Sequence, residues 1–202
     1  MMIAFACIAA TETRADDDPN EYELKAVMLF NLARFVEWPQ SAFAASNAPI
    51  VIGVLGRNPF GDALEKAVKG ETVSGRKITV EHYDSVKDLQ PSHILFVCSS
   101  EKSRVNAILA KLKGTSTLSV SEIDGFSKMR GGMVLFYTSN QKKIRLRLNL
   151  ESARAEGLII SSKLIQVAEL DKTSLLWPRP PLWGAPNLFA ASTTAPSLAA
   201  HP

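Results

Sequence analysis

Residues 131–166, GGMVLFYTSNQKKIRLRLNLESARAEGLIISSKLIQ, decide the fold expected for this chain. The segment opens with an apolar run over 133–137, and a polar turn over 138–141 follows it. From 143 to 150 the side chains then alternate, with Ile and Leu on one side and mostly cations on the other. A period of two is typical of a half-buried strand, so the segment predicts a β-hairpin closed by a loop of about four residues.

Two short helical segments are expected after the hairpin. Residues 151–156 have helical composition and stop at Gly157, a residue favoured just past a helix end. Residues 161–170 carry Leu164, Ile165 and Ala168 at helical spacing. The hairpin therefore offers one face to a core and its other, basic face to solvent or to a partner.

The rest of the chain alternates strands with helices. Expected strands cover 49–55, 76–83, 91–97 and 115–121, and expected helices cover 21–38, 60–69 and 101–112. Such alternation favours a mostly parallel sheet with helices on both faces, to which the C-terminal hairpin adds antiparallel strands. We therefore expect one α/β domain over 21–170, a three-layer sandwich with a central sheet of about six strands.

The helix expected over 21–38 has polar residues in two narrow stripes only. Its apolar surface is too wide for a helix with one buried face. We expect the sheet to cover one side and a second copy of the chain to cover the other. Pro39 is expected to end the helix at Trp38, because proline disfavours helical geometry in the preceding residue.

The two ends of the chain differ from the domain between them. Residues 1–15 hold an apolar run followed by Thr-Arg-Ala, which predicts a secretory signal peptide, although no Lys or Arg precedes the run. An upstream start or a buried strand are the alternatives. Residues 16–20 are expected to be a linker, and 171–202, rich in Pro and Ala, a disordered tail. Cleavage after Ala15 would leave Cys98 as the single cysteine, which we expect to be a buried thiol without a disulfide partner.

Composition and motifs argue against several functions. A net charge of +3 over 202 residues is too small for a nucleic-acid surface. His82, His93 and His201 have no metal-like spacing, and neither a dinucleotide nor a Gly-Lys-Ser/Thr phosphate motif is present. We therefore expect no cofactor, no metal and no catalysis. A hydrolase with an unrecognised site, dependent on Ser99 or Asp124, stays open as an alternative.

The basic face of the last strand is the best candidate for binding. Arginine's planar fork suits a carboxylate or another anion. A merely solvated face is an equal alternative, since cations two residues apart on a strand repel only weakly in water. Adding the first helix, the predicted partner-binding residues are Arg34, Trp38, Arg145, Arg147, Asn149, Arg154 and Lys163.

Several separated motifs give the chain a resemblance to the YfiR family over about 21–170. They occur in the family's order: KAVMLFNLARFVEWP (25–39), HILFV (93–97), LSVSEIDGF (118–126), GGM (131–133), IRLRLNL (144–150), Ala153-Arg154, Gly157-Leu158 and ISSKL (160–164). The resemblance implies a periplasmic α/β regulatory protein that commonly forms homodimers. It also implies repression of a membrane-anchored diguanylate cyclase through its sensor region, relief by an OmpA-like outer-membrane lipoprotein, and an effect on cyclic di-GMP and biofilm formation.

The chain departs from that pattern in two respects. The best-known member of the family has paired cysteines, so disulfide control is in doubt here, and the tail beyond Leu170 lies outside the family core. A periplasmic small-molecule sensor, with its ligand between the first helix and the sheet, is the first alternative function.

Overall fold

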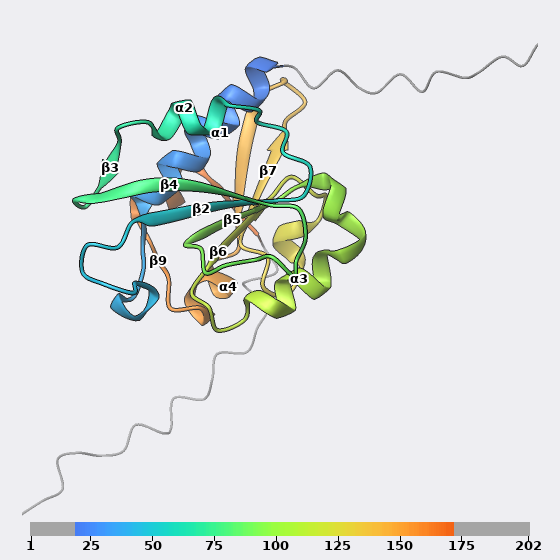
Figure 1. Cartoon of the computed structure of the whole chain (residues 1–202). Coiled ribbons are helices and arrows are strands. Elements are labelled where there is room, and N and C mark those ends of the chain that lie inside the picture. The colour runs from blue at the N-terminus through green and yellow to red at the C-terminus, as the bar shows by residue number, and fades with distance from the viewer. Residues whose placement is uncertain (1–18, 172–202) are drawn as a thin grey trace, which may run out of the picture.

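The computed structural model describes residues 19–171, which form a central sheet with helices on both faces (Figure 1). The expected signal peptide and tail lie outside these residues, apart from Asp171. The first helix, α1 (Pro19–Phe35), begins inside the segment expected to be a linker. The three-layer α/β architecture is as predicted.

The main sheet has eight strands in the order β10-β8-β7-β6-β5-β2-β4-β3. Neighbours from β8 to β7 and from β4 to β3 are antiparallel, and the other pairs are parallel. The six longer strands were expected: β2 (Ile50–Leu55), β4 (Arg76–Tyr83), β5 (Ile94–Val97), β6 (Leu118–Ser121), β7 (Val134–Thr138) and β8 (Ile144–Leu148). The two-residue strands β3 (Thr72–Val73) and β10 (Glu169–Leu170) extend the edges.

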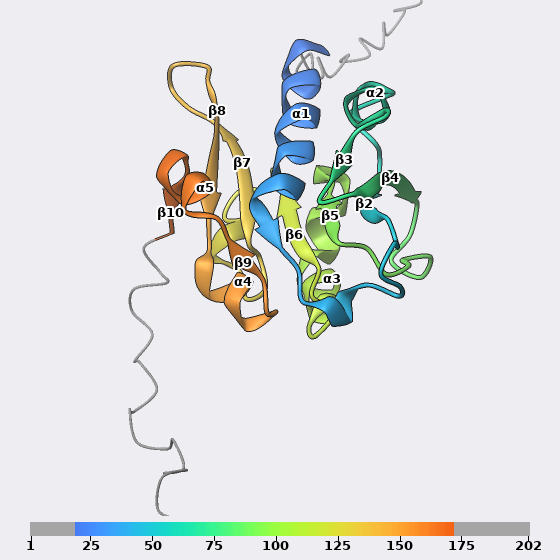
Figure 2. The same cartoon turned by 90° about the vertical axis from the view of Figure 1, so that its left-hand side faces the viewer.

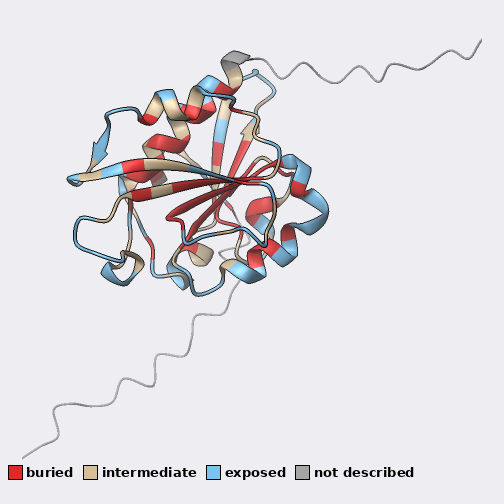
Figure 3. Ribbon diagram, in the orientation of Figure 1, coloured by how far each residue is buried: buried red, intermediate tan, exposed pale blue. Residues whose placement is uncertain are grey.

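Two hydrophobic cores fill the spaces between sheet and helices. The first includes Leu29 of α1, Ile52 and Phe96, and it also takes side chains from α2 (Ala63–Val68), α4 (Leu150–Ala155) and α5 (Ser162–Val167). The second includes Leu95 and packs under α3 (Val105–Leu112). Buried residues run along the middle of the strands, as Figure 3 shows. Short 3-10 turns cover Gln40–Ala42, Ser99–Arg104 and Phe126–Lys128.

The hairpin follows the alternation in its sequence. Leu146 and Leu148 are buried in the first core, while Arg147 between them is half-buried and Arg145 before them is exposed. The turn closes with a hydrogen bond from the Ser139 amide to the Lys143 carbonyl oxygen at 2.9 Å. Gly157 follows α4 with a φ of 75°, which glycine adopts without steric cost, so the predicted helix stop is confirmed.

The predicted end of the first helix is wrong. α1 stops at Phe35, and β1 (Val36–Glu37) pairs antiparallel with β9 (Ile159–Ile160) in a second, two-stranded sheet. The Phe35 carbonyl oxygen accepts a hydrogen bond from the Ser161 amide at 2.8 Å. Pairing with a distant strand therefore ends the helix at Phe35, before the chain reaches the residues that Pro39 restricts. The helix expected over 101–112 likewise starts late, because its first residues form the 3-10 turn.

The wide apolar surface of α1 is covered mainly from within the chain. The sheet buries one side, and α2 packs beside the helix (Figure 2). Leu24 and Val27 remain 49% and 45% exposed. A second copy of the chain on this remaining face stays a prediction.

Candidate functional site

The predicted binding residues separate into two surfaces. Arg147 lies opposite Leu135 across the hairpin, and Arg145 lies opposite Tyr137. Because Leu135 belongs to the core under α3, these two arginines share the α3 face of the sheet. Arg154 and Lys163 belong to α4 and α5, whose buried side chains enter the core on the other face. The predicted basic residues therefore lie on both sides of the sheet rather than on a single face.

The arginines on β8 are partly engaged within the fold. The Arg147 guanidinium donates to the Glu169 carboxylate at 3.2 Å and lies 4.8 Å from the centre of the Tyr137 ring. Arg145 is exposed. This surface therefore carries less net positive charge than the alternation in the sequence indicates.

Asn149 has a structural role. Its side-chain oxygen accepts a hydrogen bond from the Ser152 amide at 3.0 Å and so caps the start of α4. Its side-chain nitrogen donates to the Ser127 carbonyl oxygen at 2.8 Å. Both ends of the amide are thus used inside the chain, which positions α4 and its Arg154.

A small apolar pocket lies beside Arg154, and we call it the β9 pocket. It has a volume of about 150 Å³. Ile159 is 63% exposed, and Val167 at the end of α5 is 69% exposed. Figure 2 shows α4, β9 and α5 next to one another, with the end of α1 close by. The residues lining the pocket are Leu150, Arg154, Leu158, Ile159, Ile160 and Ile165.

The pairing of β1 with β9 joins the chain after α1 to a strand that lines the β9 pocket, but Arg34 and Trp38 do not line this pocket themselves. Trp38 lines a separate pocket with Phe43 and Arg76. Arg34 is exposed, whereas Trp38 is half-buried and its indole nitrogen donates to the His93 carbonyl oxygen at 3.1 Å. Phe43 stacks on the His93 ring at 4.5 Å. Burial, and then the nearby Arg76, lower the pKa of His93, and its ring Nδ1 accepts a hydrogen bond from the Val51 amide at 3.0 Å. Trp38 is therefore held in place by an aromatic cluster.

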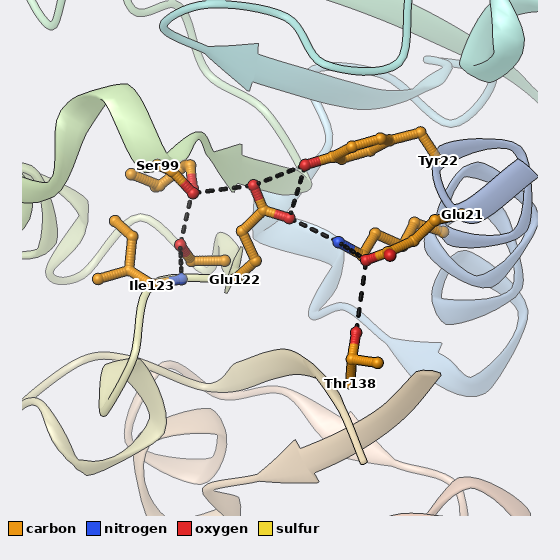
Figure 4. A network of polar contacts seen from close by, with 9 residues as sticks. Glu21, Tyr22, Ser99, Glu122, Ile123 and Thr138 are labelled. Carbon is orange, nitrogen blue, oxygen red and sulfur yellow. Dashed lines mark hydrogen bonds and ion pairs between the residues drawn. The ribbon is translucent and has the colours of Figure 1, made fainter. Parts of the chain in front are cut away.

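Sequence reasoning missed a polar network at the carboxyl ends of β5 and β6 (Figure 4). Lys25 of α1 is 4% exposed and pairs with Glu21 and Glu122, each at 2.7 Å. Glu122 also accepts hydrogen bonds from Tyr22 at 3.1 Å and Ser99 at 2.8 Å. The available signal was the Glu21–Lys25 pair, four residues apart near the start of the predicted helix. This network ties the start of α1 to the sheet.

Within residues 19–171, the serine named for the hydrolase alternative contacts a carboxylate. The Ser99 hydroxyl donates to Glu122 rather than to a histidine. His82 pairs with Glu65, and His93 accepts from a backbone amide. Within residues 19–171, no group of three or more His, Cys, Asp or Glu side chains is arranged to hold a metal ion.

Cys98 is buried and 1% exposed, as expected. Burial, with smaller contributions from Glu122 and Glu101, raises the pKa of its thiol to about 12. Relative to the ordinary value of 9.0, this lowers the thiolate fraction at pH 8 about a thousandfold.

In the chain starting at Asp16, we expect iodoacetamide to label Cys98 at least ~100-fold more slowly in native protein than in urea. A mass-spectrometric time course measures both rates, and equal rates would contradict the buried thiol.

The fold and these surfaces define an α/β domain with a small, cation-flanked apolar pocket. Residues 22–169 match the DUF4154 family, described as YfiR/HmsC-like, and the chain belongs to this family. No curated protein matches the chain. The family is a periplasmic one of non-catalytic regulators, and membership supports a regulatory role in cyclic di-GMP signalling. None of the helices formed by residues 19–171 is long and apolar enough to cross a membrane.

Proposed function

We propose that this protein is a periplasmic, non-catalytic regulator that represses a membrane-anchored signalling protein, such as a diguanylate cyclase, by binding it through the β9 pocket. The observation that carries the proposal is the exposed apolar surface around Ile159, set beside the cation of Arg154. In the same proposal, the protein is a homodimer, and an OmpA-like lipoprotein relieves repression by sequestering it.

The β9 pocket suits one apolar side chain of a partner. Its volume of about 150 Å³ is below the usual range of small-molecule sites. Protein interfaces draw most of their binding energy from a few anchors that fill such pockets inside a polar rim. Arg154 is exposed at that rim and can bind an acidic group with two parallel hydrogen bonds.

The two basic surfaces make the proposal testable by single substitutions. Arg154 borders the pocket, whereas Arg147 lies on the α3 face and already pairs with Glu169. If the partner binds at the pocket, Arg154 contributes more than Arg147. If it binds the strand face, the order reverses.

The test is capture of membrane proteins from detergent-solubilised membranes with a tagged chain starting at Asp16. We expect Ile159→Asp to reduce recovery of a membrane-anchored cyclase or sensor at least ~10-fold, because it places a charge in a desolvated contact. Arg154→Ala is expected to reduce recovery severalfold, and Arg147→Ala less. Ala107→Asp, at an exposed position on α3 that does not line the β9 pocket, is the control for an added charge and should retain capture.

Circular dichroism of each bait confirms that the substitution leaves the fold intact. Equal recovery by Ile159→Asp and the unsubstituted bait would reject the β9 pocket as the partner site. Loss with Arg147→Ala alone would move the site to the strand face. A folded bait that recovers no membrane signalling protein would reject repression by direct binding.

A further inference from the structure

A second, larger cavity lies apart from the β9 pocket. It occupies about 450 Å³ between α3, the loop that leads into β7, and α4. Figure 1 shows α3 and α4 on neighbouring parts of the molecule. The space between α1 and the sheet, in contrast, is filled by fully buried side chains such as Leu29 and Ile52. The lining residues are Asn106, Leu109, Ala110, Leu112, Lys113, Arg130, Gly131, Met133, Ser152, Ala155 and Glu156.

The floor of this cavity is apolar. Leu109 and Met133 are 4% and 2% exposed, so their side chains form a fixed base. Ala110 and Ala155 are exposed, and their small side chains leave the mouth open. The volume falls in the range of sites that bury most of a small organic ligand.

The charged side chains at the rim differ in whether they already have a partner within the chain. Lys113 and Arg130 are exposed, and within residues 19–171 neither forms a hydrogen bond or an ion pair with another side chain. The Glu156 carboxylate accepts hydrogen bonds from the Gly114 amide at 2.7 Å and the Ser116 amide at 3.3 Å. The acid is thus occupied by the backbone, and the two cations are available to a ligand.

We infer that this cavity binds an amphipathic organic anion, with an apolar body on the floor and a single carboxylate held by Arg130 and Lys113. Arginine and lysine at a partly apolar site favour such a group over a neutral one. The cavity also borders the C-terminal end of α3, where the helix dipole is negative, and this opposes a multiply charged phosphate more strongly than a single carboxylate. The site is independent of the partner surface proposed above.

The probe is decanoate below its micellar concentration, titrated into the full chain by calorimetry, with 1-decanol as the uncharged match. We expect saturable binding of decanoate at least ~10-fold tighter than that of decanol, accompanied by a rise in melting temperature. Ala110→Trp is expected to abolish this binding by filling the mouth. Ala107→Trp is the matched control, because Ala107 is exposed on the same helix but does not line the cavity.

The charge contribution is tested separately. Replacing both cations in the double variant Lys113→Gln/Arg130→Gln should weaken decanoate binding at least ~10-fold while leaving decanol unaffected. Lys69→Gln, at an exposed lysine near the end of α2, should change neither. Binding that survives Ala110→Trp, equal affinity for decanol, or the lack of any saturable decanoate binding would each overturn the inference.

Discussion

Lys25→Met is expected to lower the free energy of unfolding by about 3 kcal/mol, since removing one partner of a buried ion pair leaves the other charge uncompensated. Methionine matches the length and apolar stem of lysine, so the packing of α1 changes little. What changes is Glu122, whose side chain is 14% exposed and which would lose the Lys25 ammonium that lies 2.7 Å from its carboxylate. The cost arises because a desolvated carboxylate is expensive without a positive partner.

Urea unfolding followed by circular dichroism measures this effect. Lys66→Met is the matched control, because its ion pair with Asp62 joins two exposed side chains at 72% and 76% and is expected to contribute nothing measurable. Adding Glu122→Gln to Lys25→Met removes the uncompensated charge and should recover about 1 kcal/mol or more. Wild-type stability in the single variant would show that the network in Figure 4 does not hold α1 to the sheet.

Gly132→Ala is expected to destabilise the domain by about 3 kcal/mol, at the upper end of overpacking costs. Gly132 is buried just before β7, and a Cβ there would overlap the carbonyl oxygen of Phe126 and lie 2.9 Å from its carbonyl carbon. Backbone atoms cannot rotate away as a flexible side chain can, so the 3-10 turn and the loop must separate. That separation would also disturb the hydrogen bond from the Met133 amide to the Ser119 hydroxyl at 3.1 Å.

Thermal unfolding of Gly132→Ala is compared with that of Gly70→Ala. Gly70 has a φ of 77° with nothing within 4 Å of an added Cβ. The only expected cost of alanine there is therefore that of a positive φ, about 1 kcal/mol. A clearly larger loss of stability in Gly132→Ala would confirm that the close approach of the Phe126 backbone requires glycine at this position. Equal losses would contradict it.

Local periodicity was sufficient for most of the fold. The alternation in β8 and the apolar runs of β2 and β5 depend on neighbours within the same segment, so the strands could be recognised in the sequence. The end of α1 could not, because Val36 and Glu37 pair with Ile160 and Ile159, more than a hundred residues later. A two-residue strand has too few side chains to show a period.

The candidate site was less predictable than the fold. The sequence correctly indicated that Arg145 points away from the core, but it placed Arg145, Arg147 and Arg154 in one basic region. The structure puts the first two on the α3 face and the third beside the β9 pocket. The chain passes from one face of the sheet to the other between β8 and α4, where Asn149 caps the helix. The strand period of two does not continue into the helix, so the alternation in β8 could not predict where Arg154 lies.

The sequence by itself therefore determined the α/β class, the C-terminal hairpin and the family, because each depends on patterns or motifs read along the chain. Only the tertiary structure decided which side chains meet. Lys25 contacts Glu122 across 97 positions, and the 450 Å³ cavity combines α3, the loop before β7 and α4. These contacts depend on strand order and on the packing of helices against the sheet. Both bring together residues that are far apart in the sequence and that no local pattern links.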